Sequence, residues 1–312
     1  MEKKFELTDK FVFNTFGIKL FQIKCTKSFK YAKEGDLGGY VEKDENLDQE
    51  SDAWVSGNAR VYGDARVSGD AWVSGNAQVY GDARVSGNAR VYGNAQVYGN
   101  ARVYGDAWVY GDAWVSGDAW VSGNARVYGD ARVSGDAWVS GDAWVSGDAQ
   151  VYGDAWVSGN ARVYGNAQVY GDARVSGDAR VSGDAWVYGD AWVSGDAWVY
   201  GDAWVSGDAW VSGNARVYGN AQVYGNARVY GDADIENDNN HCGFDCFGSC
   251  NRHTHAYLTK DNKVEITCGC FRGSIEEFEK KVEKTHSGTI YEKQYKAIIN
   301  VIKIKFGLTD LI

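Results

Sequence analysis

Between Ser51 and Glu236, small, variable and apolar positions recur with a fixed period of six residues. The hexads read Gly-(Asp/Asn)-Ala-X-Val-Z, with Ser51 in place of Gly in the first and Ile235 in place of Val in the last; X is mostly Arg, Trp or Gln and Z is mostly Ser or Tyr. Thirty-one hexads follow one another without an insertion. In an extended backbone, Ala and Val point to one face while X and Z point to the other. The pattern therefore predicts one short strand per hexad, with Ala and Val inside.

The Gly-Asp or Gly-Asn pair of each hexad predicts a turn between successive strands. Glycine adopts positive φ without steric cost, and Asp and Asn are frequent turn residues. A regularly placed glycine also disfavours a helix. A short, unbroken period is typical of a solenoid, in which each coil buries its apolar face against the next. We predict an all-β solenoid over residues 51–236.

An aliphatic residue followed four positions later by a small one, as in Val55 with Ala59 and Val61 with Ala65, resembles the hexapeptide-repeat family. The resemblance implies a left-handed parallel β-helix of triangular coils, with three hexads per coil and therefore about ten coils in all. The family includes acyltransferases, relatives of carbonic anhydrase and inert scaffolds. It therefore implies a fold and leaves the activity open.

The segments on either side of the repeat are expected to be caps, because an open coil end would pair with other edges. We predict an N-terminal β cap over residues 1–50 and a C-terminal α+β cap over residues 237–312, with a hairpin and helices over about 274–284 and 291–306. The entry GDLGGYVEKDENL, the hexads and the tail CGCFRGSIEEFEKKVEKTH together resemble uncharacterised hexapeptide-repeat proteins of bacteria and phages.

With three hexads per coil, residues that are 18 apart stack in outward rows. One row is segregated into Arg and Trp, and most of its outward neighbours are Ser, which leaves the larger side chains accessible. Exposed aromatic rows often mark contact surfaces. We expect this row to bind a protein partner or a second copy; it contains Arg66, Arg84, Arg102, Trp120, Trp138, Trp156, Arg174, Trp192 and Trp210.

A purely structural role is the alternative for these outward side chains, since Trp, Tyr and Arg can stack on their own copies one coil away. A second row, from Trp54 to Arg216, mixes Trp with Arg and predicts a cation–π stack. The third row carries the five Gln of the repeat.

The charge of the chain adds a further alternative. The net charge is −10, and the acidic residues of the repeat, nearly all of them Asp at the corners, outnumber its 12 Arg by the same amount. Acidic corner rows suggest a DNA-mimic inhibitor, as in pentapeptide-repeat proteins, although the interleaved Arg and Trp argue against a uniform negative surface. Direct nucleic-acid binding is disfavoured because no basic stripe runs along the repeat.

Composition also bears on location and chemistry. No apolar run is long enough to span a membrane, and the N-terminus lacks a secretory cleavage pattern, so we expect a cytoplasmic protein without a membrane partner. Hexapeptide acyltransferases use a His base and a loop that breaks the coil, whereas all four His lie outside this repeat. We therefore favour a non-enzymatic, rod-shaped scaffold over an acyltransferase-like enzyme with its site in the C-terminal segment.

That C-terminal segment is dense in thiols and imidazoles, the residue types that zinc prefers. Their spacing departs from the usual paired Cys-x₂-Cys pattern, so we expect no cofactor and a reduced Cys cluster. The alternative is a zinc site among Cys242, Cys246, Cys250, His253, His255, Cys268 and Cys270.

Overall fold

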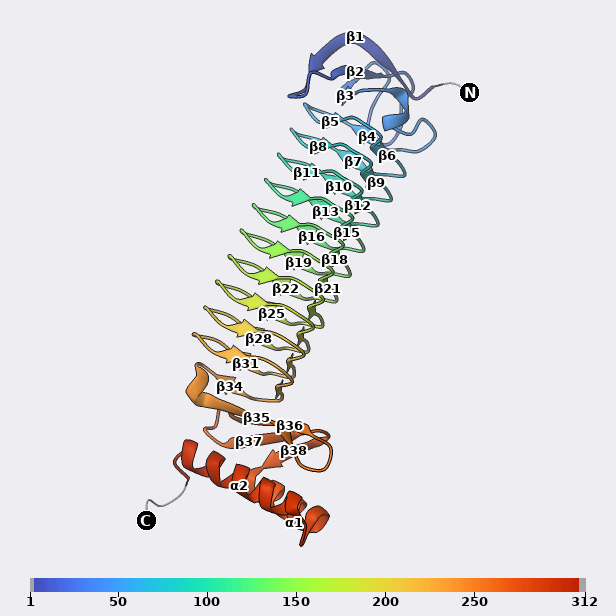
Figure 1. Cartoon of the computed structure of the whole chain (residues 1–312). Coiled ribbons are helices and arrows are strands. Elements are labelled where there is room, and N and C mark those ends of the chain that lie inside the picture. The colour runs from blue at the N-terminus through green and yellow to red at the C-terminus, as the bar shows by residue number, and fades with distance from the viewer. Residues whose placement is uncertain (1–2, 309–312) are drawn as a thin grey trace. The chain divides into compact units, whose positions relative to one another are not determined.

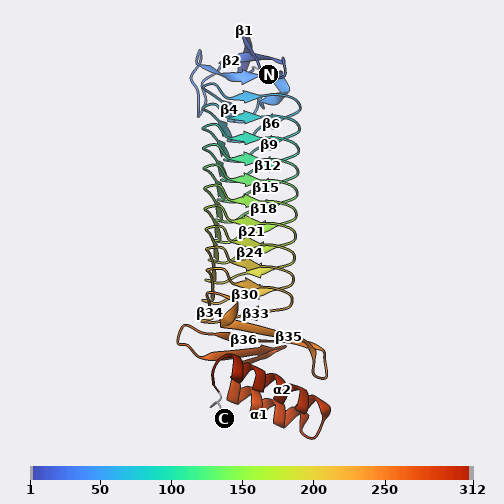
Figure 2. The same ribbon diagram turned by 60° about the vertical axis from the view of Figure 1, so that its left-hand side comes forward.

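The computed structural model describes residues 3–308, and the chain divides into two compact units, Met1–Asp172 and Ala173–Ile312. In each unit the hexads form two-residue strands that stack in parallel on the strand 18 residues later, as Figures 1 and 2 show. The predicted parallel β-solenoid is confirmed. Its left-handedness stays a prediction from the resemblance, and so do the three predicted domain segments.

The first unit begins with β1 (Phe5–Phe13), β2 (Lys19–Cys25), β3 (Leu37–Val41) and the 3₁₀ turn η1 (Asp44–Asn46). The hexad strands follow, each covering the X and Val positions, from β4 (Trp54–Val55) and β5 (Arg60–Val61) to β23 (Gln168–Val169). One of its three parallel sheets, which we call sheet B, is made in this unit of β6 (Arg66–Val67), β9 (Arg84–Val85), β12 (Arg102–Val103), β15 (Trp120–Val121), β18 (Trp138–Val139) and β21 (Trp156–Val157).

Alternation along each strand builds the core. From Ala53 to Val223, every Ala and Val of the hexads is fully buried. The ladder is regular: the backbone N–H of Trp120 donates to Ala137 O at 2.9 Å, and that of Ser122 donates to Val139 O at 2.9 Å. Small, uniform inward residues therefore fix the coil, and the outward positions are free to vary.

The N-terminal cap covers the open carbonyls of the first coil. β3 pairs in parallel with β5, so the N–H groups of Tyr40 and Glu42 donate to Ala59 O and Val61 O. The buried Asn46 amide donates to Gly63 O and Ala65 O at 3.0 and 2.9 Å. The ammonium of Lys4 donates to three carbonyls, one of them Ala53 O at 2.8 Å. Figure 1 shows β1–β3 lying over the first coil.

In the second unit the hexad strands run from β24 (Arg174–Val175) to β34 (Asp234–Ile235), and the 3₁₀ turn η2 (Asp238–Asn240) follows them. Its cap is an antiparallel sheet of β35 (His241–Phe247), β36 (Arg252–Leu258), β37 (Val264–Cys268) and β38 (Phe271–Ser274), followed by α1 (Ile275–His286) and α2 (Ile290–Lys305). The predicted hairpin and both helices are confirmed. Ser274 caps α1 in a capping box with Glu277.

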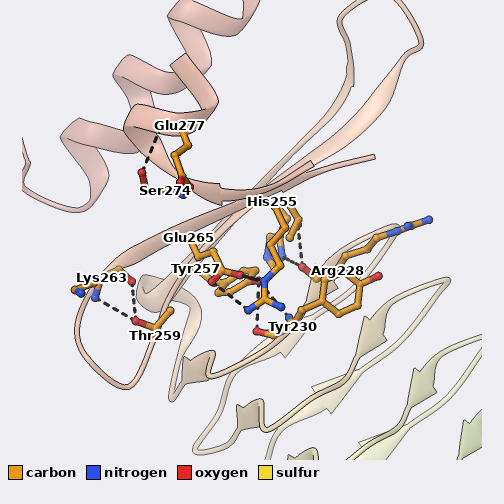
Figure 3. Close-up of polar contacts among 11 residues, drawn as sticks. Arg228, Tyr230, His255, Tyr257, Thr259, Lys263, Glu265, Ser274 and Glu277 are labelled. Carbon is orange, nitrogen blue, oxygen red and sulfur yellow. Dashed lines mark hydrogen bonds and ion pairs between the residues drawn. The ribbon is translucent and has the colours of Figure 1, made fainter. Parts of the chain in front are cut away.

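The C-terminal sheet has two faces with different tasks. One face packs its apolar residues, among them Ala256 and Ile266, against the two helices. The other face meets the last coil, where Thr267 Oγ1 donates to Arg228 O at 2.9 Å and the Tyr230 N–H donates to Tyr257 Oη at 3.2 Å. Figure 3 shows Tyr257 of the cap beside Tyr230 of the last coil. Among residues 3–308, no helix is long and apolar enough to cross a membrane.

Candidate functional site

Sheet B of the first unit presents the segregated row expected from the sequence, which we call the Arg–Trp row: Arg66, Arg84, Arg102, Trp120, Trp138 and Trp156. The three Arg are exposed, Trp120 and Trp138 are half-buried, and Trp156 is 44% exposed. Figure 2 shows the strands of this sheet stacked one above the other. The structure thus brings six of the nine predicted contact residues into one row of one unit.

The Trp side chains of this row stack face to face. The ring centroids of Trp120 and Trp138 are 4.7 Å apart with 6° between the planes, and those of Trp138 and Trp156 are 4.9 Å apart with 3°. The guanidinium of Arg102 lies 4.8 Å from the Trp120 ring centroid and covers its outer face. Because neighbouring rings cover the inner faces of the indoles, mainly the edges of these rings are exposed to solvent.

The Arg half of the row adjoins the N-terminal cap. Arg66 and Arg84 line a hollow of about 720 Å³ together with Ser68, Ser86 and acidic residues of the cap, including Asp48 and Glu50. These carboxylates partly offset the repulsion between like charges in register. Asp64 and Asp82, two residues before Arg66 and Arg84, are exposed at the adjoining corner and carry further negative charge beside this half.

Exposed carboxylates flank the Trp half. Asp118, Asp136 and Asp154 each precede a Trp of the row by two residues and are exposed. Partial desolvation, followed by the negative charges of Asp118 and Asp154, raises the pKa of Asp136. The column is therefore under electrostatic strain that nearby cations would relieve.

The other three predicted contact residues lie on the same kind of row in the second unit. Arg174 pairs in register with Trp192, and Trp192 stacks on Trp210 at 4.9 Å. The indole N–H of Trp192 donates to Ser176 Oγ at 3.2 Å, and that of Trp210 donates to Ser194 Oγ at 3.3 Å. Here the Ser neighbours bind the indole nitrogens as well as leaving space.

The mixed Trp and Arg row forms the expected cation–π stack. Within the first unit, Arg126 lies 5.2 Å from the ring centroids of both Trp108 and Trp144, and Arg90 lies 5.3 Å from that of Trp108. Both faces of Trp108 are thereby occupied by guanidinium groups. Arg and Trp of this row contact one another within the chain, so the row serves as an internal comparison for the Arg–Trp row.

The predicted Cys and His ligands do not converge on one point. Alternation along β35–β37 sends Cys242 and Cys268 to the helix side of the sheet and His255 to the side of the last coil. Cys246, Cys250 and Cys270 are exposed, and His253 bonds Asp245 at 2.6 Å. Among residues 3–308, no three His, Cys, Asp or Glu side chains are gathered as a ready metal site.

A second cluster, which spacing did not single out, lies between β35, β36 and the last coil. Asp238, His241, Asp245, His253 and His255 line a pocket of about 290 Å³. Burial, and then the neighbouring His241, lowers the pKa of His255 to about 3, and burial lowers that of His241 as well. Both imidazoles are therefore neutral near pH 7.

Strand alternation could have located this cluster. His241, Gly243 and Asp245 share one face of β35, and Gly243 faces His255 of β36 in register. A Cβ at Gly243 would lie 2.6 Å from Cε1 of His253, so the glycine makes room for that ring. The sequence offered this signal as H-x-G-x-D followed by H-x-H.

Comparison with known families concerns the repeat alone. The family model described as YdcK Beta solenoid repeat matches fourteen overlapping or separate segments that together cover a little under half of the chain: residues 53–69, 59–75, 77–93, 83–96, 95–111, 119–135, 125–141, 131–147, 149–165, 155–171, 167–183, 173–189, 179–195 and 221–233. No curated protein matches the chain. The hexapeptide-repeat and phage or bacterial relationship stays a prediction. The repeat of this chain is thus similar to YdcK β-solenoid repeats.

Proposed function

We propose that the protein is a non-enzymatic repeat scaffold that binds a second copy of itself through the Arg–Trp row of its first unit. The observation that carries the proposal is the segregation of this row into three exposed Arg followed by three stacked Trp with Asp118, Asp136 and Asp154 beside them. The mixed row contains the same residue types, but its Arg and Trp alternate over residues 72–144, so Arg90 and Arg126 each lie between two indole rings.

The row is complementary to itself in antiparallel orientation. Both halves have three members spaced one coil apart, so a twofold axis between Arg102 and Trp120 places each half against the other half of the second copy. The Arg of one copy then meet the Asp column of the other. Because the Trp faces are occupied by stacking, the incoming guanidinium groups pair with the carboxylates while the Arg stems cover the indole edges.

The rigid solenoid also reduces the conformational entropy that is lost on binding. The backbone ladder and the ring stacks hold these side chains in one arrangement before any contact forms. Preorganised side chains lose little conformational entropy on association. A contact surface with aromatic residues and Arg, rather than Lys, at its centre also has the composition typical of protein interfaces.

The aromatic half is tested by replacing Trp120, Trp138 and Trp156 with Ser together. We expect a dimer for the wild type and a monomer for the variant in light scattering coupled to size-exclusion chromatography, with the far-ultraviolet circular dichroism unchanged. The matched control replaces Trp108 and Trp144 of the mixed row with Ser, and this variant should remain a dimer. A monomeric wild type, or a dimeric triple variant, would contradict the proposal.

The charge pairing is tested by a swap. Arg66→Glu, Arg84→Glu and Arg102→Glu together should give a monomer, because like charges then face each other across the twofold axis. Adding Asp118→Arg, Asp136→Arg and Asp154→Arg should restore the dimer. Raising the ionic strength should weaken the wild-type dimer, since exposed charge pairs are screened by salt. Failure of the swap to restore association would show that the halves do not meet as proposed.

A further inference from the structure

The pocket of about 290 Å³ in the second unit is not part of the proposed self-association, and its lining suits a ligand of its own. Its polar lining includes Asp238 at the start of η2, His241 and Asp245 of β35, and His253 and His255 of β36. His241 is only 8% exposed, and the His253 side chain 9%. Nε2 of each ring is buried and has no hydrogen-bond partner in the structure. Two buried imidazole nitrogens thus lack partners in one pocket.

Hydrogen bonds fix which nitrogen of each ring carries the proton. Nδ1 of His255 lies 3.3 Å from Arg228 O, and because a carbonyl only accepts, this nitrogen is the donor. An imidazole with a single proton on Nδ1 accepts through Nε2, and the His255 ring is buried beside His241. Nε2 of His255 lies 3.0 Å from Nδ1 of His241, which must donate. His241 therefore carries its proton on Nδ1 and presents a lone pair at Nε2.

That lone pair faces a carboxylate. Nε2 of His241 lies 3.5 Å from Oδ1 of Asp238, an atom that already accepts the Gln222 N–H at 2.8 Å. With this tautomer two acceptors face each other, and they repel unless a proton or a metal ion lies between them. The chemistry of this corner therefore calls for a positively charged occupant.

A hydrogen bond also fixes the position of the proton on the His253 ring. Its Nδ1 lies 2.6 Å from Oδ1 of Asp245, so the proton is held on that side and Nε2 again carries the lone pair. Metal-binding His residues commonly donate their second ring nitrogen to a carboxylate, which fixes the tautomer and increases the basicity of the ligand nitrogen. Both rings of this pocket are oriented in the manner of metal ligands.

We propose that this pocket binds a divalent transition-metal ion, with Zn²⁺ and Co²⁺ as suitable ions, through Nε2 of His241 and the carboxylate of Asp238. Neutral imidazole and carboxylate are ligands that such ions accept, at distances of about 2.0–2.2 Å for zinc. Residues 3–308 hold no ready group of three ligands. The ion would therefore start from this pair, with water in its other positions and His253 as the second imidazole of the pocket.

The proposal differs from a cysteine site in the same cap. Cys242 borders the pocket, but its side chain packs against the helix-side core, on the opposite face of β35 from His241. The ligands are therefore nitrogen and oxygen atoms, which gives the site a distinct spectrum.

The experiment is a titration of the full-length, reduced protein with Co²⁺, followed by optical absorption and by the melting temperature. We expect one ion per chain, a rise in melting temperature, and no thiolate-to-cobalt charge-transfer band. His241→Gln and Asp238→Asn should each weaken binding at least tenfold. Asn at 238 keeps an acceptor for the Gln222 N–H, and this variant reports on the ion even if the Gln variant folds poorly.

Two controls locate the ion. His286→Gln changes a His on α1 outside the pocket, and the triple variant Cys246→Ser, Cys250→Ser and Cys270→Ser removes the exposed thiols. Neither should alter the affinity for Co²⁺. Absence of binding, a thiolate band that disappears in the triple variant, or unchanged affinity in Asp238→Asn would overturn the proposal.

Discussion

At the scale of single residues, the corner glycines let the backbones of successive coils lie close together. Gly87 has φ of +67°, and a Cβ built there would lie 2.9 Å from the backbone N of Gly105 in the next coil. Real Cβ atoms do not approach backbone atoms so closely. Glycine is therefore needed at each such corner for two reasons: it adopts positive φ, and it has no Cβ that would collide with the next coil.

Gly87→Ala should accordingly cost more than an alanine at a glycine with positive φ and open space. Gly17 provides the control, because its φ is +78° and a Cβ at this residue would have no neighbour within 4 Å. Both variants lose about 1–2 kcal/mol from the left-handed conformation, and Gly87→Ala should lose about 1–3 kcal/mol more from overpacking. Urea unfolding of both variants measures the difference, and equal losses would refute the role of the coil contact.

At the scale of elements, each end of the solenoid is closed by the same turn. Glu42 to Asn46 reads Glu-Lys-Asp-Glu-Asn, and Glu236 to Asn240 reads Glu-Asn-Asp-Asn-Asn. In both turns the Asn side-chain oxygen accepts two backbone N–H groups: Asn46 from Glu42 and Lys43, and Asn240 from Glu236 and Asn237. A 3₁₀ turn whose Asn side chain accepts two backbone N–H groups of the same turn therefore lies at each end of the solenoid.

Lys4 joins the N-terminal cap to the start of the repeat through three hydrogen bonds. It is only 6% exposed, and its ammonium donates to Asp48 O, Ser51 O and Ala53 O at 2.5–2.8 Å. Lys4→Met should therefore destabilise the protein by about 3 kcal/mol, since buried carbonyls left without a donor cost about 1–3 kcal/mol each. Lys3→Met is the control, because Lys3 is exposed and pairs only with Asp44. Urea unfolding should show little change for the control.

The same lysine makes stability depend on pH. Burial lowers the pKa of Lys4 to about 8, below its ordinary value of 10.5. Between these two values the unfolded chain binds more protons than the folded one, so the free energy of unfolding rises with pH in that window. From pH 7.5 to 9.5 the gain attributable to Lys4 should be about 2 kcal/mol. Lys4→Met should lack this slope, and an identical slope in both proteins would rule out Lys4 as its source.

Local patterns predicted the elements well and their contacts poorly. The hexad alone fixes inward Ala and Val, and the capping box at Ser274 marks the start of α1. No local pattern shows that Lys4 reaches Ala53 or that Tyr257 meets the N–H of Tyr230, because these contacts join segments 49 and 27 residues apart. Such contacts depend on tertiary packing of the caps.

At the scale of the whole molecule, the period of 18 residues predicted the rows, whereas the irregular C-terminal segment has no such period from which its contacts could be predicted. Stacking by 18 correctly placed Trp120 on Trp138. Density in sequence suggested a single Cys and His cluster, yet the period of two along β35–β37 separates Cys268 from His255. His241 and Asp238 escaped notice because their pairing depends on the turn of η2.

Because the hexad and the 18-residue period differ, duplications of different length can test the requirements of the fold and of the contact surface separately. Duplicating residues 123–140 adds a whole coil, and every later side chain keeps its row, so the Arg–Trp row gains one Trp between Trp120 and the original Trp138. Duplicating residues 123–128 adds one hexad, which preserves the Gly and Val period but moves each later strand of the first unit to the next sheet. Trp120 would then stack on Arg132, and Arg132 on Gln150.

Both duplications should fold, since each respects the hexad, and their circular dichroism should match that of the wild type. Only the duplication of 123–140 should still form a dimer in light scattering, because only it keeps adjacent Trp beside the Asp column. Dimers in both proteins would place the contact outside the Arg–Trp row. Loss of folding in the shorter duplication alone would mean that the outward rows, and not only the inward Ala and Val, specify the coil.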